Sequence, residues 1–312
     1  MNIKIIGTES MGVRGLCCLI KIGERSIVID PGLALGYKRN GLLPHPFQIA
    51  VGQRVRQDII NALKTATDIV ISHFHGDHIP LLHANPFQLS FQQLPGHFQN
   101  LRCWSKSDRD LPPKIQLRAL ELAEILGPNM KVAEGHSDGP LSFSEPVPHG
   151  MANGGFGSVM MIRINMGDII FVHASDIQLL DDSTVEKVLK WQPNIVLASG
   201  PPIYLRSISS NLRKKAWINA LHLAANVDTL ILDHHLLRCE EGAVWLDNLR
   251  DISGRNVCCG ADFMGRPRLL LEARRPDLYQ KMPVPENWHQ NYFQNPEPLY
   301  PEQLSLGLTQ PA

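Results

Sequence analysis

The nine residues ISHFHGDHI at positions 71–79 constrain this chain more than any other stretch. Four of them can bind a metal ion: His73, His75, Asp77 and His78. The preceding run TDIVIS is apolar and rich in β-branched residues, which predicts a buried strand that leads into His73. Neutral imidazole and carboxylate suit zinc, iron or manganese. The pattern therefore predicts a metal-binding loop that is supported by the end of a strand.

The spacing inside this motif indicates two groups of ligands. His73 and His75 are two residues apart, so in an extended segment their side chains project the same way. Gly76 can adopt a backbone conformation that is closed to other residues, and is expected to turn the chain there. Asp77 and His78 would then face a second point nearby.

Apolar runs and helical spacing alternate along the chain and predict a layered α/β architecture. A first domain is expected over 1–265, with an insertion at about 79–145, and 266–312 is expected to pack on it as an extension. The Pro-, Gln- and Asn-rich composition of this tail disfavours independent folding. The expected strands lie in 1–31, 67–72, 194–199 and 229–233, the helices in 52–65, 114–126, 182–190 and 208–225, and a hairpin in 158–176.

Composition excludes several classes of protein. The chain has 44% hydrophobic and 19% charged residues, and its 30 Lys and Arg balance 30 Asp and Glu. Such a neutral globular chain has no overall electrostatic attraction for nucleic acid. No apolar run reaches the roughly 20 residues that span a bilayer, and the start of the chain lacks a signal-peptide core. The six cysteines show no CxxC spacing and are expected to be reduced, so a cytoplasmic location is the default.

The stretch SHFHGDH resembles the signature of the metallo-β-lactamase superfamily. This resemblance implies an α/β fold, a four-layer αββα metallo-β-lactamase-type sandwich. It also implies three more metal ligands, each placed singly near the end of a strand. The chain supplies them in order within EPVPHGMANGG, FVHASDIQ and LILDHHLLR: His149, Asp176 and His234.

The resemblance further implies a role for each ligand. Two sets of three would each hold one divalent ion: His73, His75 and His149, and Asp77, His78 and His234. Asp176 would bridge the ions, which are expected to be zinc, with iron or manganese as alternatives. Two ions about 3.5–4 Å apart lower the pKa of a shared water, and the resulting hydroxide is the nucleophile. Asp77 would also orient that hydroxide and is therefore the expected catalytic residue.

Some ligand positions have rivals. The spacing in LILDHHLLR resembles that of tRNA 3′-processing nucleases of the superfamily, which favours His234 over His235 and aligns Arg238 with an arginine of that group. Asp233 could orient a ligand imidazole through its second nitrogen. His136 competes with His149, but a glycine-rich loop and a hairpin follow His149, as in the superfamily.

The remaining histidine near these motifs, His173, is expected in the core or behind a ligand. The loop 150–157, GMANGGFG, lacks the lysine and following helix of a P-loop and is interpreted as a flexible turn. Pro201 and Pro202 are candidates for a rigid wall of the pocket. The expected substrate contacts are basic or aromatic residues that could hold an anionic group: Lys38, Arg39, Tyr204, His235 and Arg238.

A closer resemblance extends through most of the chain. IDPGLALGYKRNGLLPHP, DHHLLR and GADFMGRPRLLLEARRPDLY are similar to segments of a group of archaeal and bacterial metallo-β-lactamase-fold proteins. The resemblance implies the fold and the metal site, and leaves the substrate open.

The function that follows is a dinuclear metal-dependent hydrolase of a small phosphodiester, a phosphorylated metabolite or another ester. A long nucleic acid and a membrane are not expected as partners, and a homo-oligomer is left open. One alternative is a diiron redox protein of the same fold, although His75 stands where such reductases usually have a carboxylate. The other is a catalytically weak metal-binding or regulatory protein, against which the complete ligand set argues.

Overall fold

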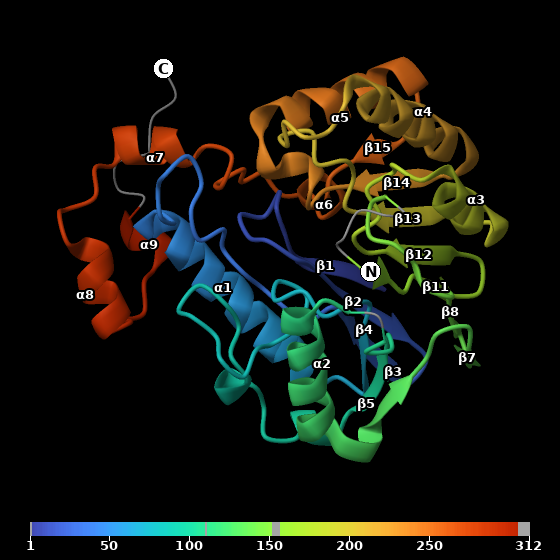
Figure 1. The fold of residues 1–312 in the computed structure, drawn as a ribbon, viewed down its shortest axis with the longest axis horizontal. Coiled ribbons are helices and arrows are strands. Elements are labelled where there is room, and N and C mark those ends of the chain that lie inside the picture. The colour runs from blue at the N-terminus through green and yellow to red at the C-terminus, as the bar shows by residue number, and fades with distance from the viewer. Residues whose placement is uncertain (1, 110, 152–156, 305–312) are drawn as a thin grey trace.

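Two facing β-sheets form the centre of the molecule (Figure 1). The computed structural model describes residues 2–109, 111–151 and 157–304. The first sheet has the order β1-β2-β3-β4-β5-β6, antiparallel as far as β3 and parallel beyond it. Its strands are β1 (Ile3–Thr8), β2 (Leu16–Ile22), β3 (Arg25–Ile29), β4 (Asp68–Ile71), β5 (Arg102–Ser105) and β6 (Met130–Val132).

The second sheet has the order β15-β14-β13-β12-β11-β8-β7, and its β12 to β15 are parallel. The expected hairpin is confirmed as β11 and β12, whose connecting turn has Gly167 at a φ of 92°. Strands β9 (Val147–Pro148) and β10 (Ser158–Val159) pair separately. The sheet consists of β7 (Ser137–Asp138), β8 (Leu141–Phe143), β11 (Ile162–Asn165), β12 (Ile170–Ala174), β13 (Ile195–Ala198), β14 (Thr229–Leu232) and β15 (Val257–Cys258).

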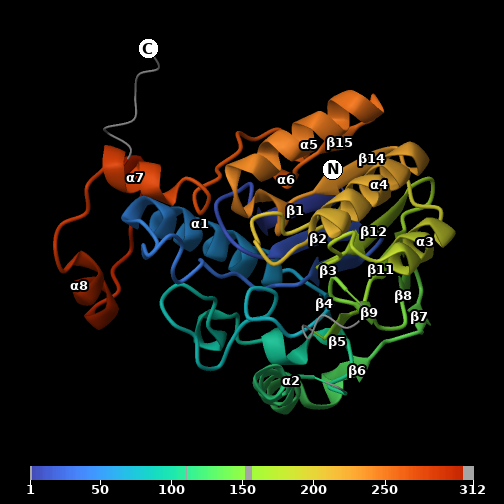
Figure 2. The same ribbon diagram turned by 45° about the horizontal axis from the view of Figure 1, so that its top comes forward.

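Helices cover the outer face of each sheet (Figure 2). Helices α1 (Pro46–Leu63) and α2 (Pro113–Leu126) pack on the first sheet, and α3 (Asp182–Lys190), α4 (Ser210–Asn226) and α5 (Glu240–Ser253) on the second. Short helices follow: α6 (Gly260–Phe263), α7 (Arg275–Lys281), α8 (Trp288–Gln294) and α9 (Pro301–Leu304). Among the described helices, none is long and apolar enough to cross a membrane.

The apolar residues confirm these layers. One buried cluster joins the inner faces of both sheets and reaches α3, α4 and α5, and a second joins the outer face of the first sheet to α1 and α2. Cys17 and Cys18 are neighbours on β2 and belong one to each cluster, because successive side chains on a strand point to opposite faces. All six cysteines are free thiols, as expected. The four-layer αββα sandwich is therefore confirmed.

Some elements differ from their expected bounds. Helix α1 begins at Pro46 rather than near 52, because the His45 side chain accepts a hydrogen bond from the Phe47 N–H and caps it. The segment expected as an insertion, 79–145, supplies β5 and β6 to the first sheet and α2 to its outer face. Helix α5 was not expected.

The tail beyond residue 266 contacts α1 and the loop that follows β3. The side chain of Gln53, on α1, donates to the Tyr292 hydroxyl and to the Glu297 carbonyl. Tyr37, from the Pro-Gly loop, stacks on Phe293 with ring centroids 6.3 Å apart. These contacts agree with an extension that packs on the same domain.

Candidate metal centre

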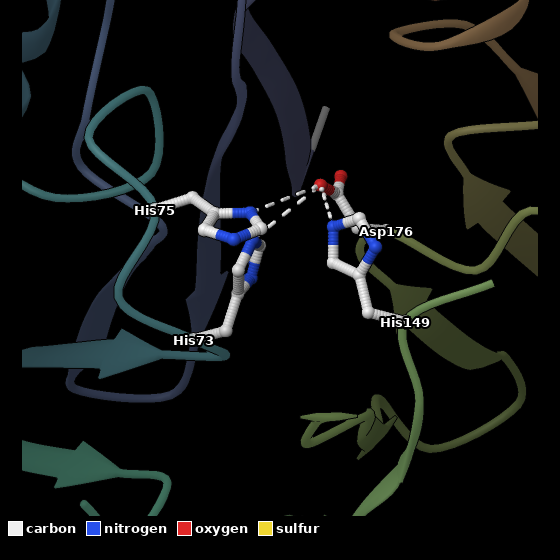
Figure 3. Close-up of side chains that lie close together, drawn as sticks. All are labelled: His73, His75, His149 and Asp176. Carbon is white, nitrogen blue, oxygen red and sulfur yellow. Dashed lines mark hydrogen bonds and ion pairs between the residues drawn. The ribbon is translucent and has the colours of Figure 1, made fainter. Parts of the chain in front are cut away.

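The ligands expected from the sequence come together at one edge of the two sheets. His73 follows β4, Asp176 follows β12 and His234 follows β14, and these are parallel strands of the two sheets. The carboxyl ends of parallel strands are the usual place for a site in such folds. His149 follows β9 and completes the group with His73, His75 and Asp176 (Figure 3).

The Asp176 carboxylate lies at the centre, and its two oxygens face different histidines. Oδ2 lies 2.8 Å from His149 Nε2, 3.4 Å from His73 Nε2 and 4.0 Å from His75 Nδ1. Oδ1 lies 3.3 Å from His78 Nε2. The carboxylate therefore separates two sets of donor atoms, as a bridging ligand must.

The set on the Oδ1 side consists of Asp77, His78 and His234. His234 Nε2 lies 3.4 Å from Asp77 Oδ2, 3.4 Å from His78 Nε2 and 3.7 Å from Asp176 Oδ1. In each set the donor atoms lie within 4.8 Å of one another, close enough to bind a common ion.

Two buried atoms at the centre indicate that the site fits metal ions. Among the described residues, His73 Nε2 and Asp176 Oδ1 have no hydrogen-bond partner. Leaving such atoms unsatisfied in the interior is costly, and a metal ion would satisfy both. Burial lowers the pKa of His75 to about 2, so this imidazole is neutral and able to bind a cation.

Asp30, which follows β3, supports the centre and was not expected from the sequence. Its carboxylate is fully buried and accepts hydrogen bonds from the Ser72 N–H, from the Ser72 and Ser175 hydroxyls and from His78 Nδ1. The bond to Nδ1, 3.0 Å long, fixes the tautomer that leaves Nε2 available to a metal. The signal that could have found it is a carboxylate directly after a buried strand.

Two local expectations were wrong. Gly76 lies in a turn, closed by the His78 N–H and the His75 carbonyl, as expected, but it does not have a positive φ; an added Cβ would lie 3.0 Å from Leu81 Cδ1 and 3.3 Å from the Arg118 guanidinium. Asp233 does not orient a ligand imidazole, because its oxygens accept from the N–H groups of Ser10 and Gly260 and from the Ser10 hydroxyl.

Two other histidines, His136, which is the rival of His149, and His173, are not part of this centre. His136 is exposed in the turn between β6 and β7. His173 is buried inside β12, where its Nε2 bonds the carbonyl of Leu16 at 2.9 Å, as expected for a core residue. Of the expected flexible turn at 150–157, residues 152–156 lie outside the described part of the chain.

Relatives of known sequence cover nearly the whole chain. A UPF0282 protein of Methanosarcina mazei is 48% identical over 292 residues, which cover 94% of this chain and 96% of that protein. The chain belongs to the UPF0282 family. The UPF0282 protein of Pyrococcus furiosus is 33% identical over 291 residues, 90% of this chain and 92% of its own. No family model matches the chain.

Solved structures also resemble the UPF0282 chain, at TM-scores below 0.5. A metal-dependent hydrolase of the β-lactamase superfamily, Tm1679, is 13% identical with a TM-score of 0.47, covering 82% of this chain and 94% of its own. The diiron β-hydroxylase CmlA from Streptomyces venezuelae is 12% identical with a TM-score of 0.47, covering 82% of this chain and 52% of its own.

Three of the expected substrate contacts meet beside the metal centre of this UPF0282 member. The Arg39 guanidinium lies 4.7 Å from the centre of the Tyr204 ring and donates to the Arg238 carbonyl at 2.7 Å. The Arg238 side chain reaches the Tyr204 hydroxyl at 3.3 Å and Asp77 Oδ2 at 3.4 Å. Lys38 is exposed on the same loop. Pro201 and Pro202 are buried after β13.

His235, the rival of His234, also reaches Asp176. Its Nε2 lies 3.2 Å from Oδ2, on the side of His149. Two donors face the His234 ring, with the Gly15 N–H 3.1 Å from Nδ1 and Arg238 Nη2 2.7 Å from Nε2. A neutral imidazole accepts at only one nitrogen, so His234 can bind a metal through Nε2 only if its proton lies on Nδ1, which requires both that the Gly15 N–H gives up Nδ1 as its acceptor and that Arg238 turns to its other acceptors.

Replacing His234 and His235 separately by alanine should distinguish the ligand from its neighbour. We expect His234→Ala to lose about one of two metal ions, because the ligand set that faces Asp176 Oδ1 then retains only Asp77 and His78 beside Asp176 itself. His235→Ala should retain both ions. Metal content per chain after dialysis is the measurement. The reverse pattern would make His235 the ligand.

Proposed function

We propose that this protein is a dinuclear metal-dependent hydrolase. The observation that carries the proposal is the position of Asp176, whose two carboxylate oxygens face two separate sets of donors. His73, His75 and His149 would hold one divalent ion and Asp77, His78 and His234 the other. Bound there, two such ions would lower the pKa of a shared water and polarise the bond to be cleaved.

The open side of the centre lies at His75 and Asp77. Their side chains are 23% and 19% exposed, whereas those of His73, His149 and Asp176 are at most 3% exposed. A substrate therefore has to approach over His75 and Asp77. We propose that the exposed Asp77 carboxylate orients a water molecule toward the substrate.

Arg238 is better suited to positioning Asp77 than to binding the substrate. The guanidinium is buried between Asp77 Oδ2 at 3.4 Å and Glu9 Oε2 at 3.5 Å and also reaches the Tyr204 hydroxyl. These contacts occupy most of its donors. Arg39, which is only partly buried, remains the better candidate for an anionic group of the substrate.

The substrate class that we propose is a small phosphodiester, a phosphorylated metabolite or another ester. The overall charge is zero, whereas an enzyme of long nucleic acids usually carries a basic surface. Zinc is the ion that we propose first, because a His- and Asp-rich centre accepts it readily.

The purified protein should contain about two divalent ions per chain and should lose hydrolysis of ester and phosphodiester substrates when a chelator removes them. Elemental analysis and a panel of chromogenic substrates provide the measurement, and re-addition of zinc or manganese should restore the activity. Well under one ion per chain after aerobic and anaerobic preparation would contradict the proposal. Full metal content without turnover would favour a regulatory protein, and bound iron with a visible absorption band would favour a redox protein.

A further inference from the structure

A cavity of about 330 Å³ opens beside the metal loop on the side from which a substrate must approach. One wall is the loop itself, with His75, Gly76 and Asp77. Arg118 of α2 also lines the cavity, next to this loop. A molecule that reached the metal centre over His75 and Asp77 would therefore pass this arginine.

The Arg118 guanidinium is half-buried and lacks an ordinary partner. Within the described residues, no hydrogen bond or ion pair joins it to any group, although it has five N–H donors. Burial lowers its pKa, although the charges of Asp77 and Glu121 act in the opposite direction. None of its nitrogens is among the buried polar atoms without a partner, so solvent reaches the guanidinium, and an anion that enters the cavity can replace this water.

Gly76 allows Arg118 to lie directly against the metal loop. An added Cβ at this position would lie 3.3 Å from both Cζ and Nη2 of the guanidinium, so a larger residue would displace it. The guanidinium thus lies close to Gly76, between the proposed ligands His75 and Asp77. Its donors are placed beside the metal centre rather than in it.

Beside the Asp77 carboxylate, which is an acceptor, the cavity is lined by two amide side chains and a second arginine. Asn85 Oδ1 accepts from the Phe87 N–H, and Gln88 Oε1 accepts from the Asn85 N–H. In each amide the oxygen is therefore occupied, and the NH₂ group remains as a donor. The Arg14 guanidinium, on the same cavity, is held by Glu272, with Nε 2.7 Å from Oε2. Such a collection of donors is suited to an oxyanion.

We propose that this cavity binds an anionic group of the substrate, a phosphate or a carboxylate that lies beside the bond to be cleaved, with Arg118 as its main ligand. The role of this site in catalysis rests on the proposed function, whereas its binding of an anion can be tested without any hydrolysis. The substrate is then a small ester that carries a second negative group outside the metal centre. Arg118 would give the enzyme its preference for charged over neutral esters.

Inorganic sulfate, a poor metal ligand, tests the site without any reaction. Calorimetric titration of the metal-loaded protein should show saturable binding, weakened about tenfold or more in Arg118→Gln. Lys114→Gln is the matched control, because Lys114 is an exposed cation on the same helix and does not line the cavity. No saturable binding by the unmodified protein, or equal binding by Arg118→Gln, would mean an adventitious ion only.

A pair of phenyl esters that differ only by a carboxylate on the acyl group tests the role in catalysis. Arg118→Gln should lower the ratio of kcat/KM for the charged ester to that for the neutral ester about tenfold, with unchanged metal content. An unchanged ratio would overturn the inference while leaving the hydrolase intact. If neither ester is cleaved, the proposed function fails, and the sulfate titration still decides on the anion site.

Discussion

Replacing Asp176 by alanine should remove both metal ions and all hydrolysis from the protein. Its carboxylate is the common neighbour of both sets, with Oδ2 2.8 Å from His149 and Oδ1 3.3 Å from His78. Neither set retains a bridging anion without it, and the repulsion between two dications is then uncompensated. Metal content should fall from about two ions to well below one per chain, as measured by elemental analysis after dialysis.

The fold should survive this change. Burial lowers the pKa of His73 and His75, and Asp176 is among the carboxylates that oppose this, so its removal favours the neutral form of these two imidazoles. Asp181→Ala is a matched control, because it is also an aspartate-to-alanine change but lies at the N-cap of α3, where Asp181 accepts from the Thr184 N–H. It should lower the free energy of unfolding by about 1 kcal/mol. It should retain both ions and full activity. Two bound ions or any remaining turnover in Asp176→Ala would contradict the bridging role.

The positions of the ligands could be predicted because strand ends are visible in a sequence. A short apolar run that stops at a histidine or aspartate identifies an edge of a sheet, and His73, Asp176 and His234 all follow such runs. Whether separate runs share one edge depends on the sheet order, which the resemblance supplied. Their meeting around one carboxylate is a property of the three-dimensional structure.

The residues that surround the ligands were harder to predict. Asp30 precedes Pro31 and Gly32 and looks like a turn residue, since its partners Ser72, Ser175 and His78 are far away in the sequence. Arg118 lies in a segment that was expected to be an insertion, on a helix whose orientation no local pattern reveals. Gly76 was expected to turn the chain, which it does, whereas the closeness of Leu81 and Arg118 to it depends on the tertiary structure.

Replacing Asp30 by asparagine should weaken the binding of the second metal ion, although Asp30 belongs to neither of the two proposed ligand sets. An asparagine could still accept from the Ser72 N–H, but its NH₂ group would then face His78 Nδ1 where the carboxylate now accepts. His78 would have to accept at Nδ1 and carry its proton on Nε2, the nitrogen that faces Asp176 Oδ1. A protonated nitrogen cannot bind a metal, so the affinity should fall about 10- to 100-fold.

Asp233→Asn is the matched control for this experiment. Like Asp30, Asp233 follows a strand, and its fully buried carboxylate accepts hydrogen bonds from backbone N–H groups and a serine hydroxyl. Its partners are Ser10 and Gly260, however, and not a ligand imidazole. Both variants should lower the free energy of unfolding by about 1–3 kcal/mol, because each leaves a buried group unsatisfied. Only Asp30→Asn should shift the metal titration measured against a competing chelator. Equal metal affinity in the two variants would show that Asp30 stabilises the fold without selecting the tautomer of His78.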